Sequence, residues 1–251
     1  MQDTKRSELN AYLTKGIHDV PGWCIPQLWQ SIWPLYERIG DGPVAEIGVY
    51  QGKFFIGLAK TFSSPSGHVA IDVFDMQQFN IGGAGEGNKE LFLQNLMAQG
   101  VDANDLHLMT RDSLSLDIRD TTEMLERFGG FRFFSIDGCH EVLHTTNDIE
   151  FAMSVTHPQG IIAVDDYMNA HWPGVMEAVA KMYLLREFAF VPLLFTCNKL
   201  LLCSRSVLDD YREHVASHIA AHFPETRMKE VVRFGYKTLT IIPNFAKWTD
   251  L

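Results

Sequence analysis

The sequence predicts an α/β protein with a Rossmann-like, mostly parallel sheet of seven strands, an antiparallel C-terminal hairpin and helices on both faces. Three observations predict this fold class. Short apolar runs alternate with segments of helical periodicity from residue 44 to residue 185. Two more apolar runs then follow each other directly around the turn at Cys197 and Asn198, which is typical of a hairpin. A content of 46% hydrophobic and 21% charged residues over 251 positions is typical of a globular protein with one sizeable core.

Each predicted element has its own signal in the sequence. The first forty residues are expected to be helical, because apolar residues recur at helical spacing in Ile25–Ile39, where Pro34 should kink or divide the segment. The predicted strands are Val44–Val49, His68–Phe74, Leu106–Thr110, Phe131–Ile136, Gly160–Val164, Phe188–Phe195 and Lys199–Ser204. The predicted helices are a segment ending at Phe62, then Lys89–Gln99, Thr121–Phe128, Glu141–Thr156, Gly174–Leu185 and Ser206–Phe223. The run Val231–Ile242 is either a further hairpin or a covering strand.

We expect a single domain over residues 1–251, because no repeat, low-complexity tract or Pro/Gly/Ser-rich linker divides the chain. Within it, residues 1–40 form an N-terminal helical cap and residues 41–205 a cofactor-binding core. Residues 206–251 supply a C-terminal helix and a covering strand.

Composition and charge exclude several classes of partner. The formal net charge of -10 argues against nucleic acid and against an anionic membrane surface. The N-terminus has no apolar signal segment, and no run of about 18 apolar residues occurs, so we expect a cytoplasmic protein. The four cysteines form no CxxC pair and are expected to be free thiols. Trp23, Trp29 and Trp33 are candidates for an interface in a homo-oligomer.

The first predicted strand leads into a loop that can bind a cofactor. Open α/β sheets bind ligands beyond the carboxyl ends of their strands. The loop reads Glu46-Ile47-Gly48-Val49-Tyr50-Gln51-Gly52, and Asp72 ends the second strand, where an acid that bonds ribose hydroxyls belongs. The spacing is ExGxxxG rather than GxGxxG, which disfavours NAD.

Acidic residues follow two strands that should be neighbours in the sheet. Asp137 follows the fourth strand, and Asp165 and Asp166 follow the fifth. Adjacent strands lie about 4.8 Å apart, so three carboxylates meet at one rim and favour a divalent cation, most simply Mg²⁺, with Mn²⁺ or Ca²⁺ as alternatives. His140 can point into the same space as a general base. Alternatively, Asp165 caps the next segment, Asp137 starts a turn and His140 lies on the surface.

With these residues in place, the chain resembles class I S-adenosylmethionine-dependent methyltransferases over about residues 40–205. The resemblance implies that Glu46, Gly48, Tyr50 and Gly52 form the cofactor loop. It implies that Asp72 binds the ribose, and that Arg111-Asp112-Ser113 form the turn beside the adenine, with Asp112 and Ser113 as contacts. Asp137 is also expected beside the cofactor.

The segment IDGCHEVLHTTND, residues 136–148, resembles a stretch of macrocin-type sugar O-methyltransferases. That resemblance implies that Asp137, Asp165 and Asp166 hold the metal, that His140 is the base and that Asp148 orients the helix. The implied partner is a small hydroxylated acceptor such as a sugar.

Three hypotheses about function therefore remain open. The first is a metal-dependent O-methyltransferase, the second an NAD-dependent oxidoreductase and the third a non-catalytic cofactor-binding protein. The ExGxxxG spacing disfavours the second hypothesis. The intact acid cluster disfavours the third, because repelling carboxylates are costly without a cation. The glycine-rich segment Asn80–Asn88 is either a lid over the cleft or a flexible connection.

Overall fold

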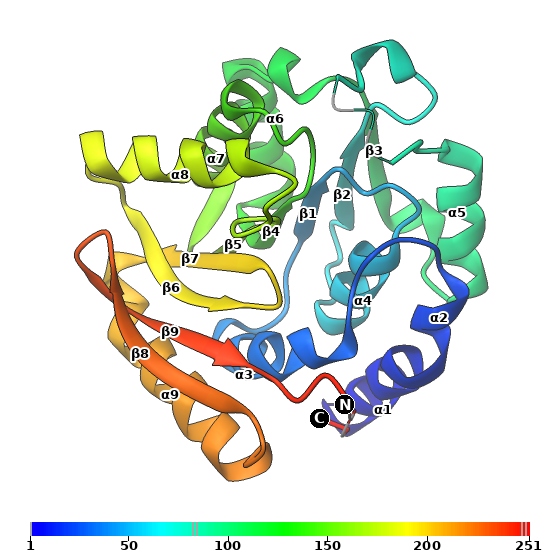
Figure 1. Cartoon of the computed structure of the whole chain (residues 1–251). Helices are drawn as coiled ribbons and strands as arrows, with labels where there is room; N and C mark the ends of the chain where they lie inside the picture. The colour runs from blue at the N-terminus through cyan, green and yellow to red at the C-terminus, as the bar shows by residue number, and fades with distance from the viewer. Residues whose placement is uncertain (1, 82, 84, 247, 249) are drawn as a thin grey trace.

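The computed structural model describes residues 2–81, 83, 85–246, 248, 250 and 251. Over these residues the chain forms a sheet of nine strands in the order β3-β2-β1-β4-β5-β7-β6-β9-β8 (Figure 1). The strands are β1 (Val44–Ile47), β2 (His68–Asp72), β3 (Leu106–Thr110), β4 (Phe131–Ile136), β5 (Thr156–Val164), β6 (Phe190–Thr196), β7 (Lys199–Ser204), β8 (Arg227–Arg233) and β9 (Tyr236–Ile242). Strands β1 to β5 pair in parallel, and β7 is antiparallel to β5 and β6.

The helices alternate with the strands, as the periodicity predicts. They are α1 (Gln2–Ala11), α2 (Ile17–Asp19), α3 (Trp29–Ile39), α4 (Lys53–Thr61), α5 (Lys89–Ala98), α6 (Ile118–Phe128), α7 (Val142–Val155), α8 (Pro173–Leu185) and α9 (Leu208–His222). Pro34 lies inside α3 and does not divide it. None of the helices in the described ranges is long and apolar enough to cross a bilayer.

The α/β class and the antiparallel C-terminal hairpin are confirmed, but the predicted count of seven strands is wrong. The run Val231–Ile242 was expected as a hairpin or a cover, and it belongs to a full hairpin of β8 and β9. Strand β9 then pairs in parallel with β6, which extends the sheet by two strands. The turn at Phe234 and Gly235 has φ angles of 50° and 86°, the left-handed values of a tight hairpin turn.

Two apolar clusters pack the helices against the sheet. Figure 1 shows α6, α7 and α8 on one side of the sheet and α3, α4 and α9 on the other. One cluster joins the N-terminal helices, α4, α5 and α9, and the other joins α6, α7 and α8. Trp29 and Trp33 are buried in the first cluster, with 0% and 1% exposure. Their suggested place in an interface is therefore wrong, whereas Trp23 is 59% exposed.

The register of the central strands positions the candidate site. Ile47 at the end of β1 pairs with Ile71 of β2 and with Ile136 of β4, and Ile136 pairs with Val164 of β5. The residues that follow these four strands therefore emerge at one edge of the sheet.

His68 makes the stability of the fold dependent on pH. The side chain is buried, and its Nδ1 accepts a hydrogen bond from the Val44 backbone N–H at 3.2 Å. Burial, with a smaller contribution from Lys5, lowers the pKa of His68 to about 4. The native state therefore binds this proton less readily than the unfolded chain, whose histidine pKa is about 6.5. The stabilisation from neutral His68 is present above that value and is lost as pH falls toward the folded pKa.

When the pH is lowered from 7.5 to 5, we expect the titration of His68 alone to reduce the free energy of unfolding by about 2 kcal/mol. Urea denaturation of the wild type and of His68→Gln at both pH values measures this difference. The amide oxygen of the introduced glutamine can still accept from Val44, but glutamine does not titrate. The variant should lose about 2 kcal/mol less than the wild type on acidification. Equal losses in the two proteins would contradict the assignment.

Candidate active site

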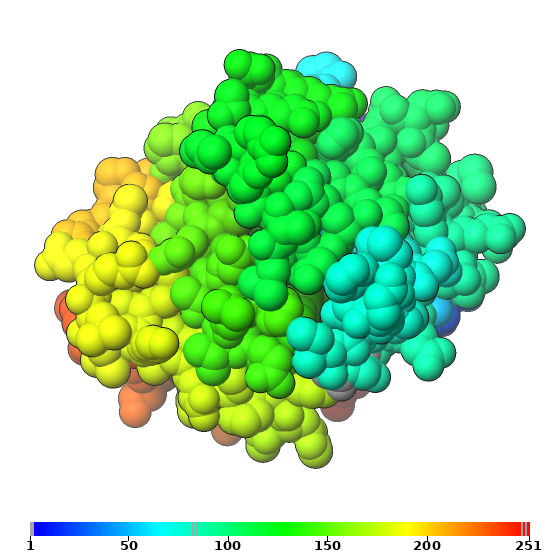
Figure 2. Space-filling view, turned by 90° about the horizontal axis from the view of Figure 1, so that it is seen from above, coloured from blue at the N-terminus to red at the C-terminus, as the bar shows by residue number. Residues whose placement is uncertain are grey.

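A cavity of about 750 Å³ opens at the carboxyl ends of β1, β2, β4 and β5. The predicted site residues that line it are Glu46, Gly48, Tyr50, Asp72, Asp112, Ser113, Asp137, His140, Asp165 and Asp166. Phe79, Asn80 and Gly85, from the loop after β2, line the same cavity. Seen from above, that loop lies next to the segments after β4 (Figure 2). The structure therefore brings nearly all of the predicted residues to one cleft.

Gly48 allows the first loop to pass close to the end of β4. Its φ is +82°, and a Cβ there would lie 1.9 Å from the backbone oxygen of Asp137. Only glycine fits this close approach without a shift of backbone. Before it, Glu46 is buried and accepts a hydrogen bond from Ser135 Oγ at 2.9 Å. Burial, followed by the charge of Asp137, raises the pKa of Glu46 well above its usual range.

Asp72 ties the first loop to the end of β2. Its carboxylate accepts hydrogen bonds from the backbone N–H groups of Tyr50, at 2.9 Å, and Phe74, at 2.7 Å. Burial raises the pKa of Asp72, and these backbone donors oppose the rise. The carboxylate also lines the cavity. A carboxylate has about four acceptor positions, so it can receive further hydroxyl donors.

Gly52 is the one predicted cofactor residue that is not among the described residues lining the cavity. It precedes α4 with a φ of +91°, and a Cβ there would lie 3.1 Å from the Phe92 ring and 3.2 Å from Leu96 of α5. The position of Gly52 is thus explained by a left-handed turn and by packing against α5.

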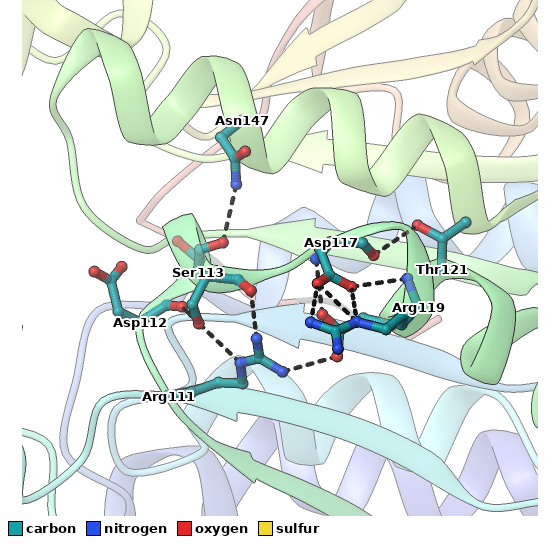
Figure 3. A network of polar contacts seen from close by, with 9 residues as sticks. Arg111, Asp112, Ser113, Asp117, Arg119, Thr121 and Asn147 are labelled. Carbon is teal, nitrogen blue, oxygen red and sulfur yellow. Dashed lines mark hydrogen bonds and ion pairs between the residues drawn. The ribbon is translucent and has the colours of Figure 1, made fainter.

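The turn after β3 is held by its own polar network (Figure 3). Asp112 accepts from the Leu114 backbone N–H at 3.0 Å, and Asn147 of α7 donates to the Ser113 carbonyl at 2.9 Å. Arg111 points away from Asn147, and its guanidinium donates to Ser115 Oγ at 2.9 Å and to Asp120 at 2.8 Å. Asp112 and Ser113 are therefore fixed at the wall of the cleft.

Asp137, Asp165 and Asp166, here called the acidic rim, lie together as expected, but each has different partners. His140 Nε2 lies 3.0 Å from Asp166 Oδ2 and 3.9 Å from Asp137 Oδ1. Asp166 Oδ1 accepts from Asn169 at 2.8 Å and from Asn198 at 2.5 Å. The φ of Asp166 is +54°, a strained value for a residue with a side chain and one that is typical of functional sites.

Lys199, at the start of β7, was missed by the sequence analysis. It is 1% exposed, forms an ion pair with Asp165 and lies 4.0 Å from Asp137 Oδ2. Its Nζ also lies 4.5 Å from the centre of the Phe54 ring. The available signal was a lysine at the start of the apolar run of β7, but its burial follows from the pairing of β7 with β5.

The charges of this cluster depend on one another. Burial opposes ionisation of Asp137, but Lys199 and then His140 lower its pKa to about 2. Burial, followed by the charge of Asp137, raises the pKa of Asp165, and Lys199 opposes that rise. Burial disfavours the imidazolium of His140, yet its contacts with Asp137 and Asp166 raise its pKa to about 9. Two cationic side chains, Lys199 and His140, thus face the three acids of this cluster.

The donor set fits a divalent cation, with a change of ligands. Oxygen atoms of Asp137 and Asp166 and a nitrogen of His140 lie within 4.8 Å of one another. Carboxylate oxygens are the donors that Mg²⁺ and Mn²⁺ prefer, so Asp137 and Asp166 could hold the cation while the His140 nitrogen stays free to accept a proton. Asp165 faces Lys199 instead. Among the predicted ligands, Asp137 and Asp166 are therefore the better placed pair.

His144, in the first turn of α7, is a further residue that sequence analysis missed. Its ring is 4% exposed and lines the cavity. Neither ring nitrogen has a hydrogen-bond partner among the residues that the structure describes. Asn147, one turn later, contacts Ser113, so this face of α7 is directed toward the turn that holds Asp112.

Asp148, which was expected to orient α7, is fully buried beneath the same turn. A Cβ at Gly138 would lie 3.4 Å from its Oδ2. Burial raises the pKa of Asp148 to about 7, and Ser113 and Asn147 oppose the rise. Its position inside the protein agrees with a structural role.

The comparisons with known proteins agree with this architecture. Residues 45–167 match the family described as a methyltransferase domain. No curated protein matches the chain significantly. Among solved structures, a putative O-methyltransferase from Klebsiella pneumoniae has a TM-score of 0.53 at 16% identity, over 78% of this chain and 89% of that one. The O-methyltransferase NovP has a TM-score of 0.54 at 12% identity, over 71% and 78%. An O-methyltransferase from Bacillus cereus, in complex with SAH, has a TM-score of 0.51 at 15% identity, over 79% and 91%.

Residues 45–167 match a methyltransferase domain, and the fold around them agrees with that of class I S-adenosylmethionine-dependent methyltransferases. The matched segment runs from β1 to the loop after β5. It therefore contains the first loop, Asp72, the Arg111–Ser113 turn and the acidic rim. The identities to the solved structures are low, so they show a shared fold.

Proposed function

We propose that the protein transfers a methyl group from S-adenosylmethionine to a hydroxyl of a small acceptor, such as a sugar, with a divalent cation at the acidic rim. One observation carries this proposal. His140, Asp137 and Asp166 converge in the same cleft as the loop that Asp72 holds. A proton acceptor and a cation site beside a cofactor loop are what hydroxyl methylation needs. The sugar follows from the resemblance to macrocin-type enzymes.

The residues of the first loop and of β2 fit the cofactor. We assign the ribose hydroxyls to Asp72, because a carboxylate can accept two charge-assisted hydrogen bonds. Asp112, Ser113 and Cys139 would flank the adenine. Gly48 lets the first loop lie close to the end of β4. When bound, S-adenosylmethionine supplies the methyl group, and the cation lowers the pKa of the acceptor hydroxyl.

We assign the role of accepting the acceptor's proton to His140. Its ring stacks on Trp172, with centroids 4.3 Å apart and an interplanar angle of 18°. This contact fixes the imidazole beside Asp137 and Asp166. The two carboxylates favour the imidazolium that forms when the ring takes the proton. They also favour a protonated resting ring, so a cation that neutralises them would favour the free base.

Removal of divalent cations tests the metal part of the proposal. Turnover with S-adenosylmethionine, measured as S-adenosylhomocysteine released in a screen of sugars and phenols, should fall below detection in EDTA and return with Mg²⁺ or Mn²⁺. Activity that survives thorough chelation would exclude a role for a metal ion, and the acids of the cluster would then be neutralised by protein side chains such as Lys199.

Asp72→Ala should weaken binding of S-adenosylhomocysteine at least tenfold, about 1.4 kcal/mol. The substitution removes the carboxylate that would accept hydrogen bonds from the ribose hydroxyls, and it also removes the hydrogen bond between the Tyr50 backbone N–H and Asp72. Asp75→Ala is the matched control, because Asp75 is an exposed acid three residues later. Calorimetry should show the control within twofold of the wild type. Equal affinities in the two variants would disprove the ribose assignment.

A further inference from the structure

Three large apolar side chains are exposed to solvent at the mouth of the cleft. Trp23, Met168 and Phe79 are 59%, 57% and 42% exposed, and all three line the cavity. They come from three separate segments: the connection between α2 and α3, the loop after β5 and the loop after β2. Exposed apolar side chains are ordinary when scattered, but a group of them around one concave site marks a binding surface.

The apolar surface continues from the mouth to the reacting end of the cleft. Trp172 is half-buried, lines the cavity and stacks on His140. A flat group that enters between Trp23 and Met168 would therefore reach Trp172 beside the proposed base. Aromatic rings pack favourably against such faces through stacking and burial of apolar area.

The charges of the cleft oppose an anionic acceptor. Its described lining includes Glu46, Asp72, Asp112, Asp137, Asp165 and Asp166. The Lys and Arg side chains of that lining are Lys53 and Arg111. Arg111 is engaged by Ser115 and Asp120 on the cofactor side. Apart from His140 and the proposed cation, which are assigned to the acceptor hydroxyl, a diphosphate would find Lys53 as the remaining cationic side chain of this described lining.

We propose that the acceptor is a neutral hydroxylated molecule with a flat, aromatic body, held by Trp23, Phe79, Met168 and Trp172. This inference rests on the proposed function and names the substrate class for the same site. Among small hydroxylated acceptors, it favours one with an aromatic body over the sugar that the resemblance suggests. The hydroxyl lies at the His140 end, and the ring lies along the apolar wall.

Calorimetry on the full chain saturated with S-adenosylhomocysteine tests the inference. The probes are 2-naphthol, methyl β-glucoside and UDP-glucose, each titrated with Mg²⁺ present. We expect 2-naphthol to bind at least tenfold more tightly than either sugar. Trp23→Ala should weaken 2-naphthol about tenfold, and Trp23→Phe, which keeps a ring, should stay within threefold of the wild type. Leu184→Ala, at a 74% exposed site on α8, controls for nonspecific adsorption and should change nothing.

Several outcomes would overturn the inference. Tighter binding of UDP-glucose or of the glucoside would assign the cleft to sugars. Unchanged 2-naphthol affinity in Trp23→Ala would remove the apolar mouth from recognition. A dimer that Trp23→Ala dissociates, with no 2-naphthol binding, would show that a second copy covers the mouth. The proposed function fails separately, because then S-adenosylhomocysteine would not bind in the first step.

Discussion

His140→Ala should lose about 10² to 10⁴-fold in turnover while it still binds S-adenosylhomocysteine. The hydroxyl of an acceptor is a poor nucleophile until its proton leaves, and His140 is the imidazole in the cleft that contacts both Asp137 and Asp166. General-base catalysis contributes a factor of this size in enzymes. Turnover under saturating substrates, with cofactor affinity measured alongside, is the required measurement.

A matched variant separates proton transfer from packing at this position. His140→Phe keeps a ring against Trp172 but cannot accept a proton. It should lose as much turnover as His140→Ala. His222→Ala, an exposed histidine at the end of α9, should turn over like the wild type. Wild-type turnover in His140→Phe would show that His140 acts by packing against Trp172 and would exclude it as the general base.

Lys199→Met should cost about 3–5 kcal/mol of unfolding free energy. Lys199 is enclosed by Asp165, Asp137 and the face of Phe54. Its removal leaves a buried carboxyl group without its counter-charge, and such a group must either stay ionised at high cost or take up a proton. Chemical denaturation at pH 7.5 measures the loss.

The double variant Lys199→Met/Asp165→Asn tests the cause of that loss. Since the unpaired charge is then removed, a large part of the lost stability should return. Lys237→Met is the control, because Lys237 is 66% exposed and pairs with Glu230 at 3.4 Å on the surface. It should change stability by less than about 1 kcal/mol. A Lys199→Met variant as stable as Lys237→Met would show that the buried ion pair does not stabilise the site.

Much of the fold was predictable because its signals are local. Apolar runs and helical periodicity mark β1 to β5 and the helices between them, and parallel pairing brings the residues after β4 and β5 together. The order of the strands was therefore enough to place Asp137, Asp165 and Asp166 at one rim. For Val231–Ile242 the choice between a hairpin and a covering strand stayed open, because the turn at Phe234 and Gly235 lacks the Asn-Gly or Asp-Gly signal of a tight hairpin.

The parts of the site that were missed depend on contacts between distant segments. Lys199 stands 34 positions after Asp165, and only the pairing of β7 with β5 brings them together. Gly52 fits the spacing of a cofactor loop, but the conformation of the turn and the packing of Phe92 and Leu96 explain it. His144 lies on a helix face whose direction is set by the contact of Asn147 with Ser113. Tertiary packing decides each of these positions.

Calorimetric titration of the full chain with S-adenosylhomocysteine, and in parallel with NADH, tests the central claim most directly. The cleft beside Gly48 and Asp72 predicts that S-adenosylhomocysteine binds one site per chain. The ExGxxxG loop predicts that NADH does not bind. Binding of NADH without binding of S-adenosylhomocysteine would contradict the methyltransferase account and would support an NAD-dependent oxidoreductase instead.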